Sequence, residues 1–552
     1  MADLIVTNAR IRTMDPAAPH AEAIAVTGET ITAVGSNADI LALRTADTRI
    51  IDAGGNSVLP GFIESHMHLF VGAAELEHLQ LFGVNGRDAL TTAIRDYAAA
   101  RPQSSFLLAQ GADYTILSKT ERVTRHDLDR IIADRPFAMT APDHHTMWAN
   151  TKALELSGLL HGRTLGPGNE IVMAADGLAE GELREGEAFD PLIEVAGESR
   201  VRLGLSTGGE PATKPTPQEL VADLAIMERG LKWAAKHGIT SIHNMDGNLY
   251  TLELLSTLES QGKLSCRVKV PFHYKNFMKL ADLEKASQMA ARYKSDWLSS
   301  GFVKVFYDGV LDSFTAVMLE PYADRPGWCG DPLFSPEHFA EVAVEADRRG
   351  LQIAVHAIGD AAVRAVLDGY EKARQANGAR DSRHRIEHIE VTTEADIPRF
   401  GQLGVIASMQ PTHPPGAGGF PLEPTVSRIG RARWPVAYPW RSIRKTGAHV
   451  VFASDWPVSP IDPLLGLQSA LTRNKWDESN PDHRFTLDEA IAGYTVEGAY
   501  TEFREDRKGA LKTGYLADIV VLSGDLDETP PDALRTITPA ATICGGRVTY
   551  EQ

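Results

Sequence analysis

Hydrophobic and polar positions follow two alternating patterns along this chain. Short segments of consecutive apolar residues are separated by longer segments in which apolar residues recur at helical spacing. The short segments are typical of strands buried on both faces, as in a parallel sheet. Eight of them occur in the order SVLPGFIESHMH, GITSIHNM, CRVKVPFHY, GFVKVFYDG, QIAVHAIGD, HRIEHIEV, GVIASMQPTH and HVVFASDWPV. Eight such strands, mostly joined by helices, predict an α/β fold built on a (β/α)8 TIM barrel.

Capping residues mark where several of the intervening helices begin. Thr216 precedes proline at the first helical position and glutamate at the third, which is a capping box, and Thr486 has the same glutamate spacing. Ser335 precedes a proline, and Asp360 follows a glycine. We therefore expect helices to begin at Thr216, Ser335, Asp360 and Thr486.

The two ends of the chain resemble each other and differ from the middle. Residues 1–57 read as short strands and turns, and residues 505–552 contain an apolar strand and a hairpin with a Gly-Gly turn. This pattern predicts one small β-domain assembled from both termini, with the barrel, residues 58–504, between them.

The first and second predicted strands are too far apart for a single helical crossover. Residues of about 72–215 must therefore include an inserted substructure. An insertion after a barrel strand lies at the C-terminal mouth of the barrel, where active sites form.

Composition limits the partners. The chain has 552 residues, and its 55 Lys and Arg against 73 Asp and Glu give a formal net charge of −18. Such a charge argues against a nucleic-acid or anionic-membrane partner. The three cysteines show no disulfide or CxxC spacing, no apolar run approaches the roughly 18 residues of a membrane helix, and no secretory leader pattern is present. We expect a soluble cytoplasmic protein that acts on a small molecule, and the sequence leaves the oligomeric state open, a homodimer included.

Residues that can bind metal gather at the ends of the predicted strands. Two histidines one residue apart in a strand share a face, and imidazole suits zinc and similar ions. A single histidine of this kind is equally well a structural residue, but a whole set at one end of a barrel predicts a metal site. A buried lysine among them is costly as an ammonium, whereas a lysine carboxylated by CO2 becomes an anionic ligand that can bridge two metals. The candidate ligands are His66, His68, Lys304, His356, His388 and Asp455.

Nine stretches that span nearly the whole chain identify a family resemblance. They are LPGFIESHMH, RPFAMTAPDHHTMWANTKAL, KHGITSIHN, GFVKVFYDGVLDSFTAVMLEPY, VHAIGD, HRIEH, SMQPTH, FASDWPV and GYLADIVVL. With them the chain resembles the metal-dependent amidohydrolase superfamily, and within it the YtcJ-like, amidohydrolase-3 group that includes N-substituted formamide deformylases. The resemblance implies a (β/α)8 barrel whose six candidate ligands, with Lys304 carboxylated, surround one or two divalent ions, zinc foremost. It also implies that the terminal domain is a composite β-sandwich.

The resemblance also suggests residues of the substrate pocket. The group usually has Asp-Gly-His before an Asn-x-x-Ala-Leu element, whereas this chain has His144 in place of the glycine and His145 as the matching histidine, followed by Asn150. Glu185 matches a glutamate in the next loop, and Trp148 either lines the pocket or packs within the insert. The predicted catalytic residues are Asp455, His145 and His413, and the predicted substrate-binding residues are His144, Asn150, Glu185 and Trp148.

These residues predict a hydrolase. A divalent ion lowers the pKa of bound water from about 15.7 to near 7, which supplies hydroxide at neutral pH. Asp455 can accept a proton from the attacking water and return it to the leaving nitrogen, and His145 or His413 can polarise the carbonyl. We expect cleavage of a C–N bond in an amide, N-substituted formamide, carbamate or cyclic amide. An esterase or carbamate-ester hydrolase, and a metal-binding protein without turnover, are the competing interpretations. The absence of an HxE…PCxxC signature argues against a nucleic-acid deaminase.

Overall fold

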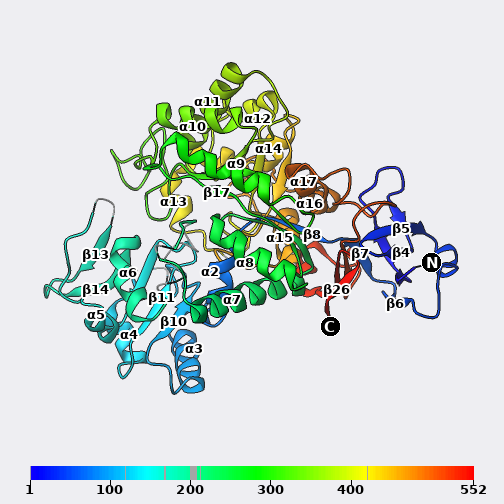
Figure 1. Cartoon of the computed structure of the whole chain (residues 1–552). Coiled ribbons are helices and arrows are strands. Elements are labelled where there is room, and N and C mark those ends of the chain that lie inside the picture. The colour runs from blue at the N-terminus through cyan, green and yellow to red at the C-terminus, as the bar shows by residue number, and fades with distance from the viewer. Residues whose placement is uncertain are drawn as a thin grey trace.

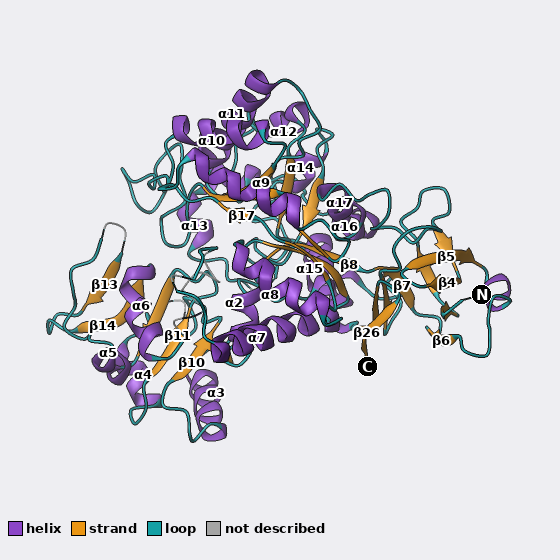
Figure 2. Cartoon of the chain, in the orientation of Figure 1, coloured by secondary structure: helices purple, strands orange, loops and turns teal. Residues whose placement is uncertain are grey.

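The computed structural model describes residues 2–118, 120–166, 169–198, 200, 208–211, 213–418 and 420–552. In Figure 1 a central α/β region carries an additional lobe on one side and a strand-rich region with both termini on the other. Figure 2 shows helices around the central strands. Within the described ranges, no helix is both long and apolar enough to cross a bilayer.

The central strands form a parallel series in chain order. They are β8 (Phe62–Met67), β15 (Ile239–Asn244), β16 (Arg267–Lys269), β17 (Phe272–His273), β19 (Phe302–Phe306), β20 (Gln352–Ala357), β21 (Arg385–His388), β22 (Ile406–Met409) and β23 (Val450–Phe452). The third predicted strand is divided: β16 pairs with β15 and with the short β18 (Leu298–Ser299), while β17 pairs with β19. The other neighbours also pair in parallel, from β8 with β15 to β22 with β23. This order agrees with the predicted TIM-barrel fold.

The first and last strands of the series meet just beyond their C-terminal ends. The backbone N–H of Asp455 donates to the carbonyl of His66 at 2.9 Å, and the N–H of His68 donates to the carbonyl of Trp456 at 2.7 Å. These two bonds bring the segments after β8 and β23 together, so candidate ligands far apart in sequence become neighbours.

Helices pack around this sheet. They are α7 (Pro217–Lys236), α8 (Leu249–Ser260), α9 (Leu283–Arg292), α10 (Pro336–Arg348), α11 (Asp360–Asn377), α12 (Ile397–Leu403), α13 (Thr425–Ile429), α14 (Trp440–Arg444), α15 (Pro463–Thr472), α16 (Leu487–Gly493) and α17 (Val496–Thr501). In the longest of them, α7, the residues at helical spacing Met227, Leu231, Ala234 and Ala235 are fully buried in the main core, whereas Val221 is exposed.

Three of the four predicted capping residues are confirmed. Thr216, Ser335 and Thr486 each accept a hydrogen bond from the backbone N–H three residues later, and Thr216 and Thr486 form complete capping boxes. The prediction for Asp360 is wrong, because Gly359 occupies the N-cap and Asp360 is the first helical residue. Its carboxylate instead accepts the N–H of Leu319 at 2.7 Å, a long-range partner that local spacing does not reveal.

Strands from both ends of the chain share one sheet. The terminal elements are β1 (Leu4–Thr7), β2 (Arg10–Arg12), β3 (His20–Ala21), β4 (Ala23–Thr27), β5 (Thr30–Gly35), α1 (Asn37–Leu41), β6 (Arg49–Asp52), β7 (Ser57–Pro60), β24 (Ile519–Leu522), β25 (Pro539–Cys544) and β26 (Arg547–Glu551). They form sheets of order β5-β4-β1-β6 and β26-β25-β24-β7-β2-β3, in which β24 pairs with β7. Gly545 and Gly546 form the predicted turn, both with positive φ. The domain boundaries near residues 57 and 505 stay a prediction.

The segment between β8 and β15 forms a lobe with its own sheet. After α2 (Leu69–Glu75) its elements are β9 (Leu79–Gln80), α3 (Arg87–Ala100), β10 (Leu107–Gln110), α4 (Arg125–Ile131), β11 (Phe137–Thr140), β12 (Thr146–Ala149), α5 (Thr151–Leu156), β13 (Glu170–Met173), β14 (Ala179–Arg184) and α6 (Gly186–Val195). The sheet order is β13-β14-β12-β11-β10-β9. Alternate residues of β11 enter two different cores, Met139 one and Ala138 the other, so both faces of this sheet are covered.

A buried ion pair joins the barrel to the terminal strands, and it generates a stability prediction. Arg267 of β16 donates to both carboxylate oxygens of Asp518, at 2.8 and 3.0 Å, and both side chains are buried. Asp518→Ala would leave the guanidinium buried without its partner, so we expect a loss of about 3–5 kcal/mol of stability. Denaturant unfolding measures it.

The control is Glu551→Ala, which removes a half-exposed partner of Arg49 and should change stability by less than about 1 kcal/mol. Equal effects of the two substitutions would contradict this account of the ion pair.

Candidate functional site

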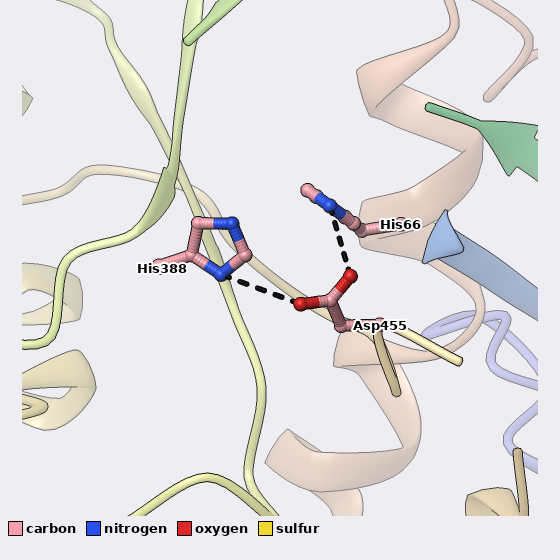
Figure 3. A group of neighbouring side chains, drawn as sticks. All are labelled: His66, His388 and Asp455. Atoms are coloured by element: carbon pink, nitrogen blue, oxygen red, sulfur yellow. Dashed lines mark ion pairs between the residues drawn. The ribbon is translucent and has the colours of Figure 1, made fainter. Parts of the chain in front are cut away.

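Three buried side chains from distant parts of the chain converge at the C-terminal ends of the strands. His66 lies in β8, His388 ends β21 and Asp455 follows β23. One ligand atom from each lies within 4.8 Å of the others (Figure 3). His66 Nε2 is 3.3 Å from Asp455 Oδ1, and His388 Nδ1 is 3.8 Å from Asp455 Oδ2. This arrangement is the core of the candidate metal centre.

The remaining predicted ligands surround these three. His68 Nε2 is 3.3 Å from Asp455 Oδ1. The ring of His356 lies 4.4 Å from that of His388, and its Nε2 is 3.0 Å from the carbonyl of Gly309. Lys304 is fully buried on β19, next to the strand that carries His356. The structure therefore places His68 against Asp455 and His356 against His388, with Lys304 buried on the neighbouring strand, and the role of all six as ligands stays a prediction.

The donor set fits a divalent ion. Among the described residues, His66 Nε2, Asp455 Oδ1 and Lys304 Nζ are buried and have no hydrogen-bond partner. Buried polar atoms without partners are costly and rare in folded proteins. Imidazole nitrogens and a carboxylate oxygen are the donors that zinc takes in catalytic sites, so an ion at this position would satisfy them.

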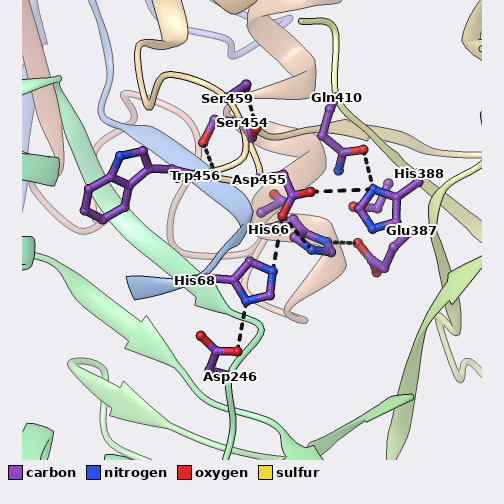
Figure 4. Close-up of polar contacts among 12 residues, drawn as sticks. His66, His68, Asp246, Glu387, His388, Gln410, Ser454, Asp455, Trp456 and Ser459 are labelled. Atoms are coloured by element: carbon purple, nitrogen blue, oxygen red, sulfur yellow. Dashed lines mark hydrogen bonds and ion pairs between the residues drawn. The ribbon is translucent and has the colours of Figure 1, made fainter. Parts of the chain in front are cut away.

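Each central imidazole is held by a side chain on one of its ring nitrogens (Figure 4). His66 Nδ1 lies 2.7 Å from Glu387 Oε2 and His68 Nδ1 lies 2.9 Å from Asp246 Oδ1, both on the ring nitrogen opposite to the one that faces Asp455. In His388 it is Nδ1, the nitrogen nearest Asp455, that lies 3.0 Å from Gln410 Oε1, which leaves Nε2 free of that contact. Such partners fix the orientation and tautomer of metal-binding histidines. Sequence reasoning missed Asp246, Glu387 and Gln410.

The backbone is strained at two of these residues. His388 has φ +76° and Asp455 has φ +60°, in the left-handed region that favours glycine. Such strain persists only where the surroundings fix it, and it concentrates at functional sites.

Charges inside the site shift several pKa values. Burial favours the neutral acid of Asp455, but the neighbouring His66 and His68 outweigh it and hold its pKa well below the ordinary value. Burial opposes the charged form of His68, yet Asp246 raises the pKa of His68 to about 10. Burial lowers the pKa of Lys304 to about 8. Asp455 is therefore ionised at neutral pH, and a metal ion at His68 would have to displace a proton.

A cavity of about 150 Å³ opens beside the candidate ligands. Two further predicted residues, His145 and His413, line it. His145 Nδ1 lies 2.9 Å from Glu185 Oε2. Glu185 does not line the cavity itself, but it positions His145, which does. His413 Nε2 is 4.0 Å from Asp455 Oδ2. The insert and the loop after β22 thus both contribute walls to the pocket.

The other three predicted substrate contacts also lie outside the cavity lining. The Asn150 amide caps α5: it accepts the N–H groups of Phe137 and Ala153 and donates to two backbone carbonyls, which uses its hydrogen-bonding capacity within the insert. Trp148 is buried in a core of the insert, edge to face with Tyr114 at 5.3 Å. His144 Nε2 lies 3.0 Å from Glu75. In this structure these side chains make contacts within the insert and with α2, as one of the two alternatives for Trp148 allowed, and their contact with substrate stays a prediction.

The sequence matches a known family and known relatives. The family described as "Amidohydrolase family" matches residues 49–550. Protein LONG AFTER FAR-RED 3 of Arabidopsis thaliana is 30% identical over 570 residues, which cover 100% of this chain and 92% of the relative. The N-substituted formamide deformylase of Arthrobacter pascens is 24% identical, with 100% and 99% covered.

A solved structure has the same fold. An uncharacterized metal-dependent hydrolase from Pyrococcus horikoshii OT3 superimposes with a TM-score of 0.69 at 24% identity, covering 96% of this chain and 98% of that one. The family match spans nearly the whole chain, and the site provides a donor set for a metal. The chain therefore belongs to the amidohydrolase family and is a hydrolase that acts on carbon–nitrogen bonds other than peptide bonds.

Proposed function

We propose that this protein is a metal-dependent hydrolase that cleaves the C–N bond of an amide, N-substituted formamide, carbamate or cyclic amide. The observation that carries the proposal is the convergence of His66, His388 and Asp455, with buried donor atoms that lack partners, at the edge of a cavity. The similarity to an N-substituted formamide deformylase supports the substrate class.

One or two zinc ions would be held by the six candidate ligands. The histidines among them are His66, His68, His356 and His388, with Asp455 and a carboxylated Lys304 as the anionic ligands. When bound, the ion would lower the pKa of a water molecule and act as a Lewis acid toward the scissile carbonyl.

The proton is carried by Asp455. Its low pKa keeps it ionised, and it lines the cavity, so it can accept a proton from the attacking water. The same carboxyl group can then deliver that proton to the leaving nitrogen, which departs as a neutral amine.

Two histidines can stabilise charge on the carbonyl oxygen. Glu185 lies 2.9 Å from His145 Nδ1 and Glu390 lies 3.6 Å from His413 Nδ1, so each carboxylate can orient its ring toward the cavity. A protonated ring held at Nδ1 can donate from Nε2, and both rings line the cavity.

Two finer assignments complete the proposal. The N-terminal sheet β5-β4-β1-β6 and the sheet that combines strands of both termini form a composite β-sandwich outside the catalytic unit, since their apolar residues share one core. Location in the cytoplasm and the oligomeric state stay predictions from the sequence.

Metal content tests the ligand assignment. The purified protein should contain roughly one to two equivalents of zinc, and His66→Ala combined with His68→Ala should lose most of it. Elemental analysis measures this. His126→Ala, a substitution of a largely exposed histidine in α4, should retain the metal. Full retention in the double variant would remove the central assignment.

Carboxylation of Lys304 is testable against a second buried lysine. Lys269 lies in β16, and burial lowers the pKa of its ammonium to about 8, as in Lys304, but it is not among the candidate ligands. In protein equilibrated with ¹³C-labelled CO2, we expect one carbamate resonance that Lys304→Met abolishes and Lys269→Met leaves in place. A resonance that depends on Lys269, or none in the wild type, would reject the bridging role of Lys304.

Replacing Asp455 tests the proton carrier. Asp455→Asn keeps the size of the side chain but removes the basic oxygen, so kcat should fall at least about 100-fold, or roughly 2.7 kcal/mol on the barrier. Steady-state kinetics on an N-formyl amine, with metal analysis of the same sample, separates lost catalysis from lost metal. Activity within a few-fold of wild type would assign the proton transfer elsewhere.

A further inference from the structure

The substrate cavity contains more negative charge than the hydrolytic reaction uses. Besides the candidate ligands it is lined by three carboxylates from separate segments: Asp143 of the insert, Asp312 after β19 and Glu390 after β21. None of these has a role in the proposed proton transfer or belongs to the candidate ligands. A cavity of about 150 Å³ with three extra carboxylates therefore requires its own explanation.

The side-chain hydrogen-bond partners of these three carboxylates are neutral hydroxyl groups. Thr425 Oγ1 donates to Asp312 at 2.6 Å, Tyr114 donates to Asp143 at 3.0 Å, and Tyr438 donates to Glu390 at 2.9 Å. Hydroxyl groups solvate a carboxylate but carry no positive charge.

Among the described residues, no lysine or arginine lies within ion-pair distance of these three carboxylates. The guanidinium of Arg428 pairs with Asp324 and bonds the backbone carbonyl of Asp312, and its charge offsets only part of the unfavourable environment of the Asp312 carboxylate. Besides the hydroxyl group of Tyr438, Glu390 has His413 beside it, at 3.6 Å.

The three carboxylates act on one another. Burial, together with the charges of Asp143 and Glu390, raises the pKa of Asp312 to about 7. Mutual repulsion of this kind is unfavourable, and a positively charged ligand in the cavity would relieve it.

A separate observation indicates that a ligand fills this part of the cavity. His413 lies between the two regions: its Nε2 is 4.0 Å from Asp455 Oδ2, and its Nδ1 is 3.6 Å from Glu390 Oε1. Its side chain is only 8% exposed, and Nε2 has no hydrogen-bond partner among the described residues. A ligand that receives a hydrogen bond from His413 Nε2 therefore lies beside Asp455, and Glu390, on the other side of the same ring, lines the same cavity.

Aromatic side chains complete the lining around the carboxylates. Phe420 lies edge to face against His413 at 5.6 Å, and Phe306 and Tyr438 also line the cavity. Aromatic faces attract organic cations through their quadrupole, and the attraction grows when water is excluded. Carboxylates and aromatic rings together form a lining suited to an alkylammonium group.

We propose that the physiological substrate is a cationic amide, in which an ammonium group on the side chain lies among Asp312, Glu390 and Asp143 while the scissile C–N bond lies at Asp455. This inference rests on the proposed hydrolase function and names the substrate class of the same site. The carboxylates disfavour a substrate with an anionic side group, because they would repel it.

A pair of substrates of equal shape tests the charge alone. N-formyl-2-(trimethylammonio)ethylamine and N-formyl-3,3-dimethylbutylamine differ only in replacing the quaternary nitrogen with carbon. With zinc-loaded protein, kcat/KM should be at least about tenfold higher for the cation, since interactions with a desolvated charge reach this size. Release of formate measures both reactions.

Variants then locate the selectivity. Asp312→Asn should reduce the ratio of the two kcat/KM values by about tenfold, because it removes one charge from the cluster. Asp331→Asn removes an exposed carboxylate outside the cavity and should leave the ratio unchanged. An Asp312→Asn ratio equal to that of wild type would overturn the assignment of this carboxylate.

The outcomes for the inference and for the proposed function are distinct. Equal hydrolysis of the two compounds, or faster hydrolysis of the neutral one, supports the hydrolase and overturns the cationic substrate. If neither compound is hydrolysed, the proposed function fails for formamides, and calorimetric binding decides the inference. At least tenfold tighter binding of the cation would then support it, and equal binding would overturn it.

Discussion

The ionised carboxylate of Asp455, buried where the first and last strands meet, is the constraint on which the site depends. A buried charge is unfavourable unless neighbouring groups stabilise it, and here the imidazoles of His66, His68 and His388 do so. Each of these rings then needs a partner of its own, which Glu387, Asp246 and Gln410 provide. The polar network therefore extends outward from this one carboxylate. Some of its donor atoms find partners within the protein, and those that do not are available to a metal.

The network continues into the interior of the barrel below the metal centre. Glu387 also binds Arg385, whose guanidinium contacts His243, and His243 faces Glu502. A fully buried arginine in the core of a barrel is tolerated because each of its neighbours is polar or carries the opposite charge. His243 thus has a structural role in this network.

The sequence predicted the strands and the candidate ligands more completely than the side chains that hold those ligands in place. Strand ends are visible as apolar runs followed by histidine or aspartate, and a barrel places such ends together whatever their separation in sequence. Glu387 also has a local signal, since a carboxylate inside the apolar run HRIEH needs a buried partner. Asp246 and Gln410 have no such local signal, because their role depends on which distant histidine each one contacts. Asn150 shows the opposite limit: its motif was recognisable, but a capping asparagine and a substrate contact have the same sequence signature.

The insert shows why pocket residues are harder to predict than ligands. His145 reaches the cavity, while its neighbour His144, in the left-handed region with φ +61°, pairs with Glu75 of α2 instead. A shift of one position along the chain separates a side chain that lines the cavity from one that contacts a neighbouring helix. Irregular backbone has no periodicity from which the direction of each side chain could be inferred.

The pairing of β7 with β24 has a consequence for how the protein is made. β7 leads directly into β8, which carries His66, yet its antiparallel partner lies at Ile519–Leu522, close to the end of the chain. A ribosome releases residues in order, so the first strand of the barrel is synthesised long before the strand that anchors it. The nascent chain must keep β7 unpaired on that side until Ile519–Leu522 has left the ribosome. A chain that stops before this strand cannot complete the sheet.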